Sequence, residues 1–184
     1  NSRKSKGYVR DVFQQNHMNN LQGNLGIGHV RYPTAGGIGK EFAQPMYVNT
    51  PYGISLAHNG NLTNSKKLAA ELFHAERRHI NTDSDSEVLL NIFALELSKQ
   101  EAVFPKPKDF FSAVEKTHLR INGAYAVVAL ITGYGILAFR DPLGIRPLSI
   151  GIRKGKNRNE YVVSSETALF SSTGFKFLRD VEPG

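Results

Sequence analysis

The order of the expected secondary-structure elements constrains the fold of this chain more than any other sequence feature. Short apolar runs typical of strands come first, amphipathic stretches typical of helices follow, and strand-like runs return from Gly123 onward. This order suits helices packed on an antiparallel sheet better than a strand–helix alternation around a parallel sheet. The sequence therefore predicts an α+β fold.

The strands and helices can be placed by their apolar spacing and by the residues that flank them. Strands are expected over 25–30, 46–48, 53–57, 124–131, 135–140, 148–152 and 161–164. Helices are expected over 64–79, 84–99, around 110–121 and over 166–171. The second helix begins with Ser84-x-x-Glu87, the pattern of a capping box. Its predicted buried stripe is Val88, Leu89, Ile92, Phe93 and Leu97.

Length and composition indicate one globular domain. The chain has 184 residues, of which 40% are hydrophobic, and its apolar runs fall short of the ~20 residues that a membrane span needs. It contains no Cys, which excludes a disulfide, a thiolate metal site and a Cys nucleophile within these residues and fits a cytoplasmic protein. The basic start lacks the apolar region of a secretory signal and lacks Met, so we expect an internal piece of a longer chain.

The net charge of +7 raises the question of an anionic partner. The basic residues fall in separate short runs, at 3–6, 77–78 and 153–158, and the last run suits a solvated loop. We therefore expect no nucleic-acid binding. The six His do not cluster, and His74 and His79 lie five residues apart, where one helix face needs three or four. No metal site is expected.

Three short motifs carry side chains that suit an amino-acid ligand. Arg31, between apolar residues, could clamp a carboxylate, although a surface ion pair is the commoner role of an Arg. Asp85 could accept a ligand ammonium or interact with the start of its helix. Asn59-Gly60 is typical of a tight turn, because both residues tolerate positive φ, and could also supply hydrogen-bond donors to an oxyanion. Taken one at a time, each of these residues is explained better by its structural role. Taken together, they are explained better by the binding of an amino acid.

The motifs around these residues resemble a known family. His29-Val30-Arg31-Tyr32-Pro33-Thr34-Ala35-Gly36, Ala57-His58-Asn59-Gly60-Asn61-Leu62 and Thr82-Asp83-Ser84-Asp85-Ser86-Glu87 are similar to segments of the glutaminase domain of class II glutamine amidotransferases. Further segments, at 139–148, 164–166 and 177–181, are similar to those of one branch of this family. The enzymes of that branch make phosphoribosylamine from phosphoribosyl pyrophosphate in purine synthesis. The resemblance covers the chain from about Gly7.

The resemblance implies a fold and a domain organisation. The fold would be the αββα sandwich of the N-terminal-nucleophile hydrolases, incomplete at the N-terminus. Residues 1–184 would be a partial glutaminase domain, and the phosphoribosyltransferase domain of the same chain would be absent. The attacking residue of the family is an N-terminal Cys, which these residues lack, so we expect the segment alone to be inactive.

The resemblance also implies roles for individual residues. Arg31 would hold the α-carboxylate of glutamine and Asp85 its α-ammonium. The Asn59 side-chain amide and the Gly60 backbone N–H would form the oxyanion hole. Residues 32–34 would belong to a loop that closes over glutamine, with Tyr32 and Thr34 among the substrate-binding residues.

Cofactors and partners are expected on the same basis. This domain would need no cofactor, and Mg would be bound in the absent phosphoribosyltransferase domain. The partners would be glutamine, the phosphoribosyltransferase domain and further copies of the chain in a homo-oligomer, with no nucleic acid and no membrane. Two alternatives remain open, a non-catalytic glutamine-binding module and another class II amidotransferase.

Overall fold

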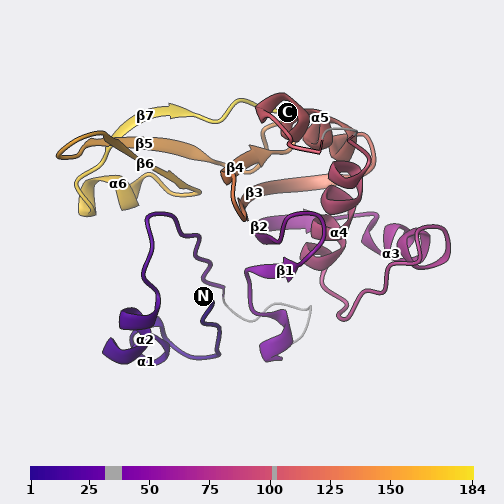
Figure 1. Ribbon diagram of the computed structural model, residues 1–184, viewed down its shortest axis with the longest axis horizontal. Helices are drawn as coiled ribbons and strands as arrows, with labels where there is room; N and C mark the ends of the chain where they lie inside the picture. The colour runs from indigo at the N-terminus through magenta and orange to yellow at the C-terminus, as the bar shows by residue number, and fades with distance from the viewer. Residues whose placement is uncertain (32–38, 101–102) are drawn as a thin grey trace.

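Two antiparallel sheets form the framework of the protein (Figure 1). The computed structural model describes residues 1–31, 39–100 and 103–184. The first sheet has the order β1-β2-β3-β4 and consists of β1 (Met46–Val48), β2 (Ile54–Leu62), β3 (Gly123–Ile131) and β4 (Gly135–Arg140). The second has the order β6-β5-β7 and consists of β5 (Ser149–Lys154), β6 (Asn159–Ser164) and β7 (Lys176–Asp180). The predicted α+β class is confirmed.

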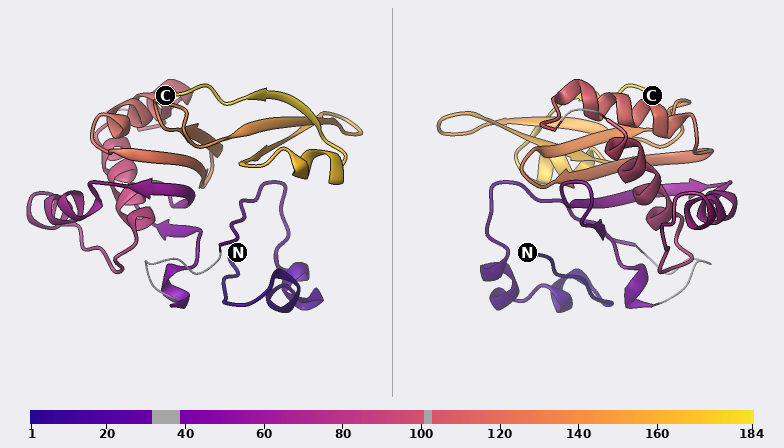
Figure 2. Two further views of the ribbon diagram at one scale, coloured as in Figure 1. Left: turned by 180° about the vertical axis from the view of Figure 1, so that it is seen from behind. Right: turned by 45° about the vertical axis from the view of Figure 1, so that its right-hand side comes forward.

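Three helices form a layer against the four-stranded sheet (Figure 2). They are α3 (Ser65–His74), α4 (Asp85–Ser98) and α5 (Pro107–His118), and α4 packs on β1 and β2 while contacting both of the other helices. The short helix α6 (Ala168–Ser172) contacts β7 in the second sheet, where it buries Phe170. The remaining short helices are α1 (Val9–Val12), α2 (Gln15–Asn20) and the 3₁₀ helix η1 (Lys40–Phe42). Among the described residues, none of the helices combines the length and apolarity that crossing a membrane requires.

Helix α4 is the centre of the hydrophobic core. All twelve residues from Ser86 to Leu97 are buried. The five residues of the predicted apolar stripe are therefore buried as expected, but so are the residues on the other sides of the helix. A helix enclosed by a sheet and two other helices has no solvated face, which explains the apolar residues around its circumference. Phe93 is fully buried, with its ring centroid 6.0 Å from that of Phe139 on β4.

The predicted start of α4 is correct, whereas its predicted capping box and the predicted end of α3 are wrong. Helix α4 begins where expected, but the capping box is wrong, because Ser84 makes no side-chain cap and the Glu87 carboxylate bonds Asn81 and Thr82 instead. Helix α3 ends at His74, five residues earlier than predicted. Its end is followed by Arg77 in the left-handed region, at φ 54°, a conformation that no helix continues through.

One strand prediction and one turn prediction are also wrong. Residues 25–30 form no strand, because the segment has no ladder partner among the described residues. Asn59-Gly60 forms no turn: the two residues lie inside β2 and pair with Ala126 and Tyr125 of β3. Strand β7 was not expected from its residue pattern, although it occupies part of a segment quoted for the resemblance.

Two glycines allow β2 and β3 to approach closely at one end of their ladder. Gly60 has φ 149° and Gly123 has φ 147°, in a region that side chains disfavour. A Cβ on Gly60 would lie 2.0 Å from the Ala124 carbonyl oxygen, and one on Gly123 would lie 2.1 Å from the Asn61 carbonyl oxygen. The sequence thus uses Gly at these two positions because backbone atoms of the facing strand occupy the space.

Replacing Gly123 by Ala should therefore weaken this ladder far more than an ordinary Gly→Ala change at positive φ. Gly133→Ala is the matched control, because Gly133 has φ 84° and open space around its Cβ position. We expect Gly133→Ala to cost about 1 kcal/mol of unfolding free energy and Gly123→Ala roughly 3 kcal/mol, through added overlap with backbone. Denaturant unfolding of both variants measures the difference. Equal costs would contradict the proposed overlap.

Candidate functional site

The edge of β2 beyond the end of β1 exposes backbone donors in a regular pattern. The N–H of Thr63 donates to the Asn122 carbonyl, so odd-numbered residues of this segment face β3. The N–H groups of His58 and Leu62 point the other way, toward the Gln44 Oε1 (2.6 Å) and the Asp85 Oδ2 (3.0 Å). Gly60 lies midway between them, so its N–H points to the same edge.

This alternation also separates the side chains of β2. Ile54, Leu56 and Leu62 face the core that α4 fills. Asn59 has the opposite parity and is exposed on the other face of the sheet. The Asn59 side chain is therefore exposed to solvent one residue before Gly60, where a carboxamide could act as a second donor.

Asp85 reaches this edge from the start of α4. Its Oδ2 accepts the Leu62 N–H, and its side chain remains 23% exposed. The carboxylate thus lies two residues along the strand from the Gly60 N–H and still has capacity to bind a cation. The structure brings together Asp85, Asn59 and Gly60, which are distant in the sequence.

A second carboxylate fixes the loop before α4. The Glu87 carboxylate accepts four hydrogen bonds of 2.6–2.9 Å from the backbone and side chains of Asn81 and Thr82. Burial raises the pKa of Glu87, but these hydrogen bonds outweigh burial and hold the pKa below its usual value. The loop that leads into Asp85 is thereby anchored. The Ser84-x-x-Glu87 pattern predicts a capping box for Glu87, whereas its anchoring of Asn81 and Thr82 carries no signal in the sequence.

His58 is a buried polar residue of the site that sequence reasoning did not single out. Its Nδ1 lies 3.1 Å from the Ser86 Oγ and 3.9 Å from the Asp85 Oδ1, and its Nε2 has no hydrogen-bond partner among the described residues. Burial lowers the pKa of His58 to about 4; Asp85 opposes this shift, while His29 and Arg146 add to it. Its even position in β2, in step with Leu56 and Leu62, is the signal that could have placed it on the core face.

Arg31 lies on the segment next to this edge. Its side chain is exposed, and its Nη1 donates to the Phe42 carbonyl at 3.4 Å. Phe42 is two residues before Gln44, so this contact places Arg31 against the segment whose Gln44 side chain bonds His58 at the edge of β2. Tyr32 and Thr34 lie outside the described residues, and their roles stay predictions.

The loop after β4 brings another cation toward the site. Asp141 is fully buried and accepts the backbone N–H groups of Tyr125, Ile145 and Arg146 at 2.9–3.3 Å. Burial raises the pKa of Asp141, but these hydrogen bonds outweigh burial and leave the pKa below its usual value. Arg146 then lies close enough to His58 for its charge to lower the pKa of that imidazole.

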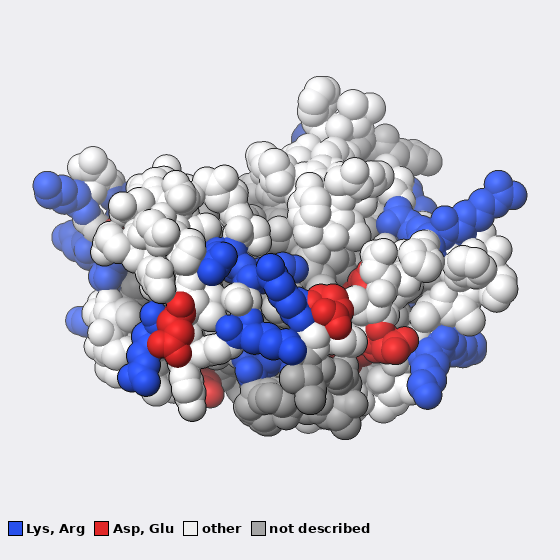
Figure 3. Space-filling view, turned by 90° about the horizontal axis from the view of Figure 1, so that it is seen from below, with Lys and Arg blue, Asp and Glu red and all other residues white. Residues whose placement is uncertain are grey.

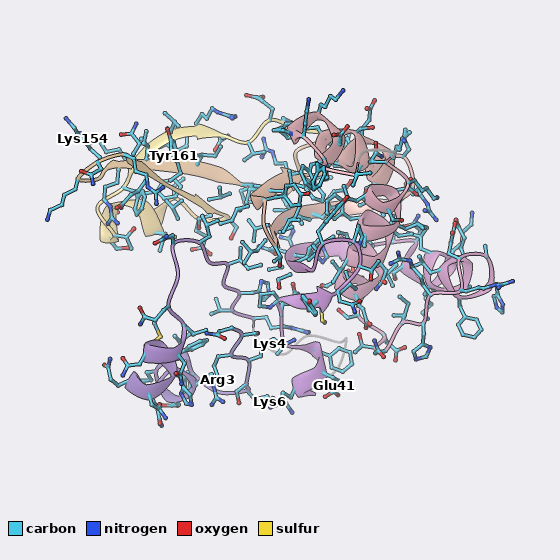
Figure 4. All side chains as sticks on the ribbon, in the orientation of Figure 1. Arg3, Lys4, Lys6, Glu41, Lys154 and Tyr161 are labelled. Carbon is cyan, nitrogen blue, oxygen red and sulfur yellow. The ribbon has the colours of Figure 1, made fainter. Side chains whose placement is uncertain are left out.

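Charged groups are unevenly spread on the lower face of the molecule (Figure 3). Lys and Arg side chains gather near the middle of this face, and Asp and Glu side chains lie beside them. Arg3, Lys4 and Lys6 come from the N-terminal segment and lie near η1, which carries Glu41 (Figure 4). Within residues 1–31, 39–100 and 103–184, no group of three or more His, Cys, Asp or Glu side chains could hold a metal ion.

Comparison with known proteins defines the class. A family model described as a glutamine amidotransferase domain matches residues 38–172, and the chain belongs to this family. The chain is 57% identical over 182 residues to the amidophosphoribosyltransferase of Pasteurella multocida and 47% identical over 182 residues to that of Saccharomyces cerevisiae. These alignments cover 99% and 98% of the chain, and the chain spans 36% of each relative. The chain thus corresponds to the glutaminase part of amidophosphoribosyltransferases.

A solved structure supports the same assignment. The glutamine phosphoribosylpyrophosphate amidotransferase of B. subtilis, complexed with ADP and GMP, matches 97% of this chain with a TM-score of 0.78 and 34% sequence identity, over 35% of its own length. This likeness confirms the predicted N-terminal-nucleophile hydrolase fold.

The burial of His58 predicts that its imidazole stays neutral across the physiological pH range. In the full-length protein with isotope-labelled His, the His58 ring signal should keep its chemical shift from pH 8 down to 5.5, because its pKa is about 4. The signal is assigned as the one lost in His58→Gln. A titration midpoint near the ordinary value of ~6.5 would show that the ring is not desolvated as described.

Proposed function

We propose that the full-length protein is an amidophosphoribosyltransferase, in which this chain releases ammonia from glutamine. The observation that carries the proposal is the placement of the Gly60 N–H and the Asp85 carboxylate on one strand edge, with the Asn59 carboxamide beside them. The relatives' name and the family match support the same function. The ammonia would then replace the pyrophosphate of phosphoribosyl pyrophosphate in a phosphoribosyltransferase domain of the same protein.

Two charged side chains of the site bind the two polar groups at the α-carbon of glutamine. Asp85 binds the α-ammonium of glutamine, and the Arg31 guanidinium binds the α-carboxylate, for which its forked donors are suited. With both ends held, the side-chain amide lies at a fixed place along the strand edge. This positioning removes much of the entropy cost of the reaction.

The chemistry begins with attack on the amide carbon of glutamine. The attacking group is the N-terminal Cys thiolate expected from the family resemblance, since these 184 residues contain no Cys. The carbonyl oxygen becomes an anion and accepts hydrogen bonds from the Asn59 Nδ2 and the Gly60 N–H. The α-amino group of the same Cys, which takes the thiol proton, would pass it to the leaving nitrogen. Collapse of the tetrahedral intermediate then releases ammonia and leaves a thioester, which water hydrolyses to glutamate and the free thiol. The segment alone should accordingly release no ammonia.

Several expectations remain predictions for the full-length protein. These are a cytoplasmic location, a homo-oligomeric state, and Mg bound in the phosphoribosyltransferase domain. The glutaminase reaction proposed for this chain uses side chains and backbone groups only.

Removal of the Asn59 carboxamide should slow the chemical step. In the full-length enzyme, Asn59→Ala should lower kcat for glutamine by about 10²–10³, the loss typical of one oxyanion donor. Synthesis from free ammonia should continue, because that reaction bypasses this site. Asn159→Ala, an exposed Asn at the start of β6, is the matched control. An unchanged kcat in Asn59→Ala would refute the oxyanion hole.

Replacement of Arg31 should affect binding instead. Lys keeps the charge but loses the two parallel donors, so Arg31→Lys should raise KM for glutamine about tenfold with a smaller change in kcat. Arg158→Lys, in the exposed turn between β5 and β6, is the control. Steady-state kinetics with glutamine and with ammonia measures both effects. A lower kcat at unchanged KM would assign Arg31 to the transition state rather than to substrate binding.

A further inference from the structure

A side chain continues the ladder between β1 and β2 past the point where β1 begins. The last backbone pair at this end is Met46 with Leu56, and the next hydrogen-bonded pair in the same register would join residue 44 to His58, two residues further along. The Gln44 carboxamide makes both hydrogen bonds of that pair: its Oε1 accepts the His58 N–H at 2.6 Å, and its Nε2 donates to the His58 carbonyl at 3.2 Å. A carboxamide has the donor and acceptor of a peptide group, so it can replace one.

These two bonds fix the backbone that leads into the oxyanion hole. The His58 carbonyl shares its peptide plane with the Asn59 N–H, so the bond from Gln44 sets the orientation at which Asn59 begins. Two residues beyond Gly60, the Asp85 carboxylate holds the Leu62 N–H in the same way. The Asn59-Gly60 segment is therefore held on both sides by side-chain clamps at a strand edge that β1 does not cover.

Gln44 is itself held in place. Its side chain is half-buried, and the Lys4 Nζ donates to the carbonyl of the adjacent Pro45 at 3.0 Å. Lys4 comes from the N-terminal segment and is labelled in Figure 4. Donors act on a developing oxyanion most strongly when they need no rearrangement, which gives a positioned clamp at His58 a catalytic consequence.

We propose that Gln44 is a positioning residue for the oxyanion hole, which acts by replacing a backbone pair of β1 and fixing the peptide groups of His58. The inference rests on the proposed glutaminase function. Gln44 touches neither the substrate nor the reacting atoms; its effect passes through the backbone to Asn59 and Gly60.

The test compares Gln44→Met and Gln44→Glu in the full-length enzyme. Gln100 supplies matched controls, because its Nε2 also bonds a backbone carbonyl, that of Glu96 at 3.0 Å, at the far end of α4. Gln44→Met removes both hydrogen bonds at similar volume. We expect kcat for glutamine to fall roughly 10–100-fold, as misplacement of catalytic groups does, with KM for glutamine and ammonia-dependent synthesis nearly unchanged. Gln100→Met should behave as wild type.

Gln44→Glu adds a readout that a purely structural role would not give. The ionised carboxylate repels the His58 carbonyl, whereas the protonated carboxyl restores both the donor and the acceptor. The ratio of its kcat to that of wild type should therefore rise as the pH falls from 8 toward 5, because the facing carbonyl raises the pKa of the introduced group. The nearby Lys4, Asp85, His29, His58 and Arg146 are common to both enzymes, so the ratio cancels their own titration.

The outcomes separate this inference from the proposed function. A wild-type enzyme that releases no ammonia from glutamine overturns both. An active wild type with an unaffected kcat in Gln44→Met, or a change in KM alone, overturns the positioning role only. If Gln44→Met also loses ammonia-dependent synthesis through misfolding, Gln44→Glu decides: a rising ratio supports the role, and a flat ratio overturns it.

Discussion

The hydrogen bond from the Leu62 N–H to the Asp85 carboxylate joins the helical layer to the edge of the sheet, and the geometry of the site depends on it. Helix α4 is buried along almost its whole length, so its first residue has a fixed position. The Glu87 hydrogen bonds anchor the loop before it. Asp85 therefore links the rigid helical layer to a part of the β2 edge that β1 does not cover. One oxygen of this carboxylate accepts the backbone N–H, and the Asp85 side chain stays 23% exposed.

Most of the fold could be predicted because long periodic segments dominate it. The apolar spacing of α4 and the compact strands β3 and β4 carry strong local signals. The errors fall where distant contacts override local preference. Asn59-Gly60 has the composition of a turn, yet its pairing with β3 keeps both residues extended. The segment 25–30 has the composition of a strand, but a strand exists only where another strand pairs with it.

The site residues also differ in how far the sequence indicates them: some are indicated by their motifs, and others only by their contacts in the folded chain. Asn59, Gly60 and Asp85 could be selected from their motifs, and the structure brings them to one edge. Gln44 and Glu87 could not be selected, because their roles lie in hydrogen bonds to backbone groups that only the folded chain brings near. A Gln before a strand or a Glu in the first turn of a helix has many possible partners in sequence terms. His58 is intermediate: no motif indicates a role for it, but the alternation of side chains along β2 could have placed it on the core face.

The close approach of β2 and β3 also limits how this site can change over evolution. A Cβ at Gly60 would meet the backbone of Ala124 and Tyr125, which no rotamer change in a neighbouring side chain can move away. A side chain at position 60 is therefore incompatible with this pairing, and Gly is required there as long as β2 and β3 keep their register. Substitutions near this end of the ladder are accommodated more easily at exposed positions such as Asn59, Arg31 and Arg146. The backbone geometry at Gly60 thus follows from the pairing of the two strands, whereas the exposed side chains around it are not tied to that pairing.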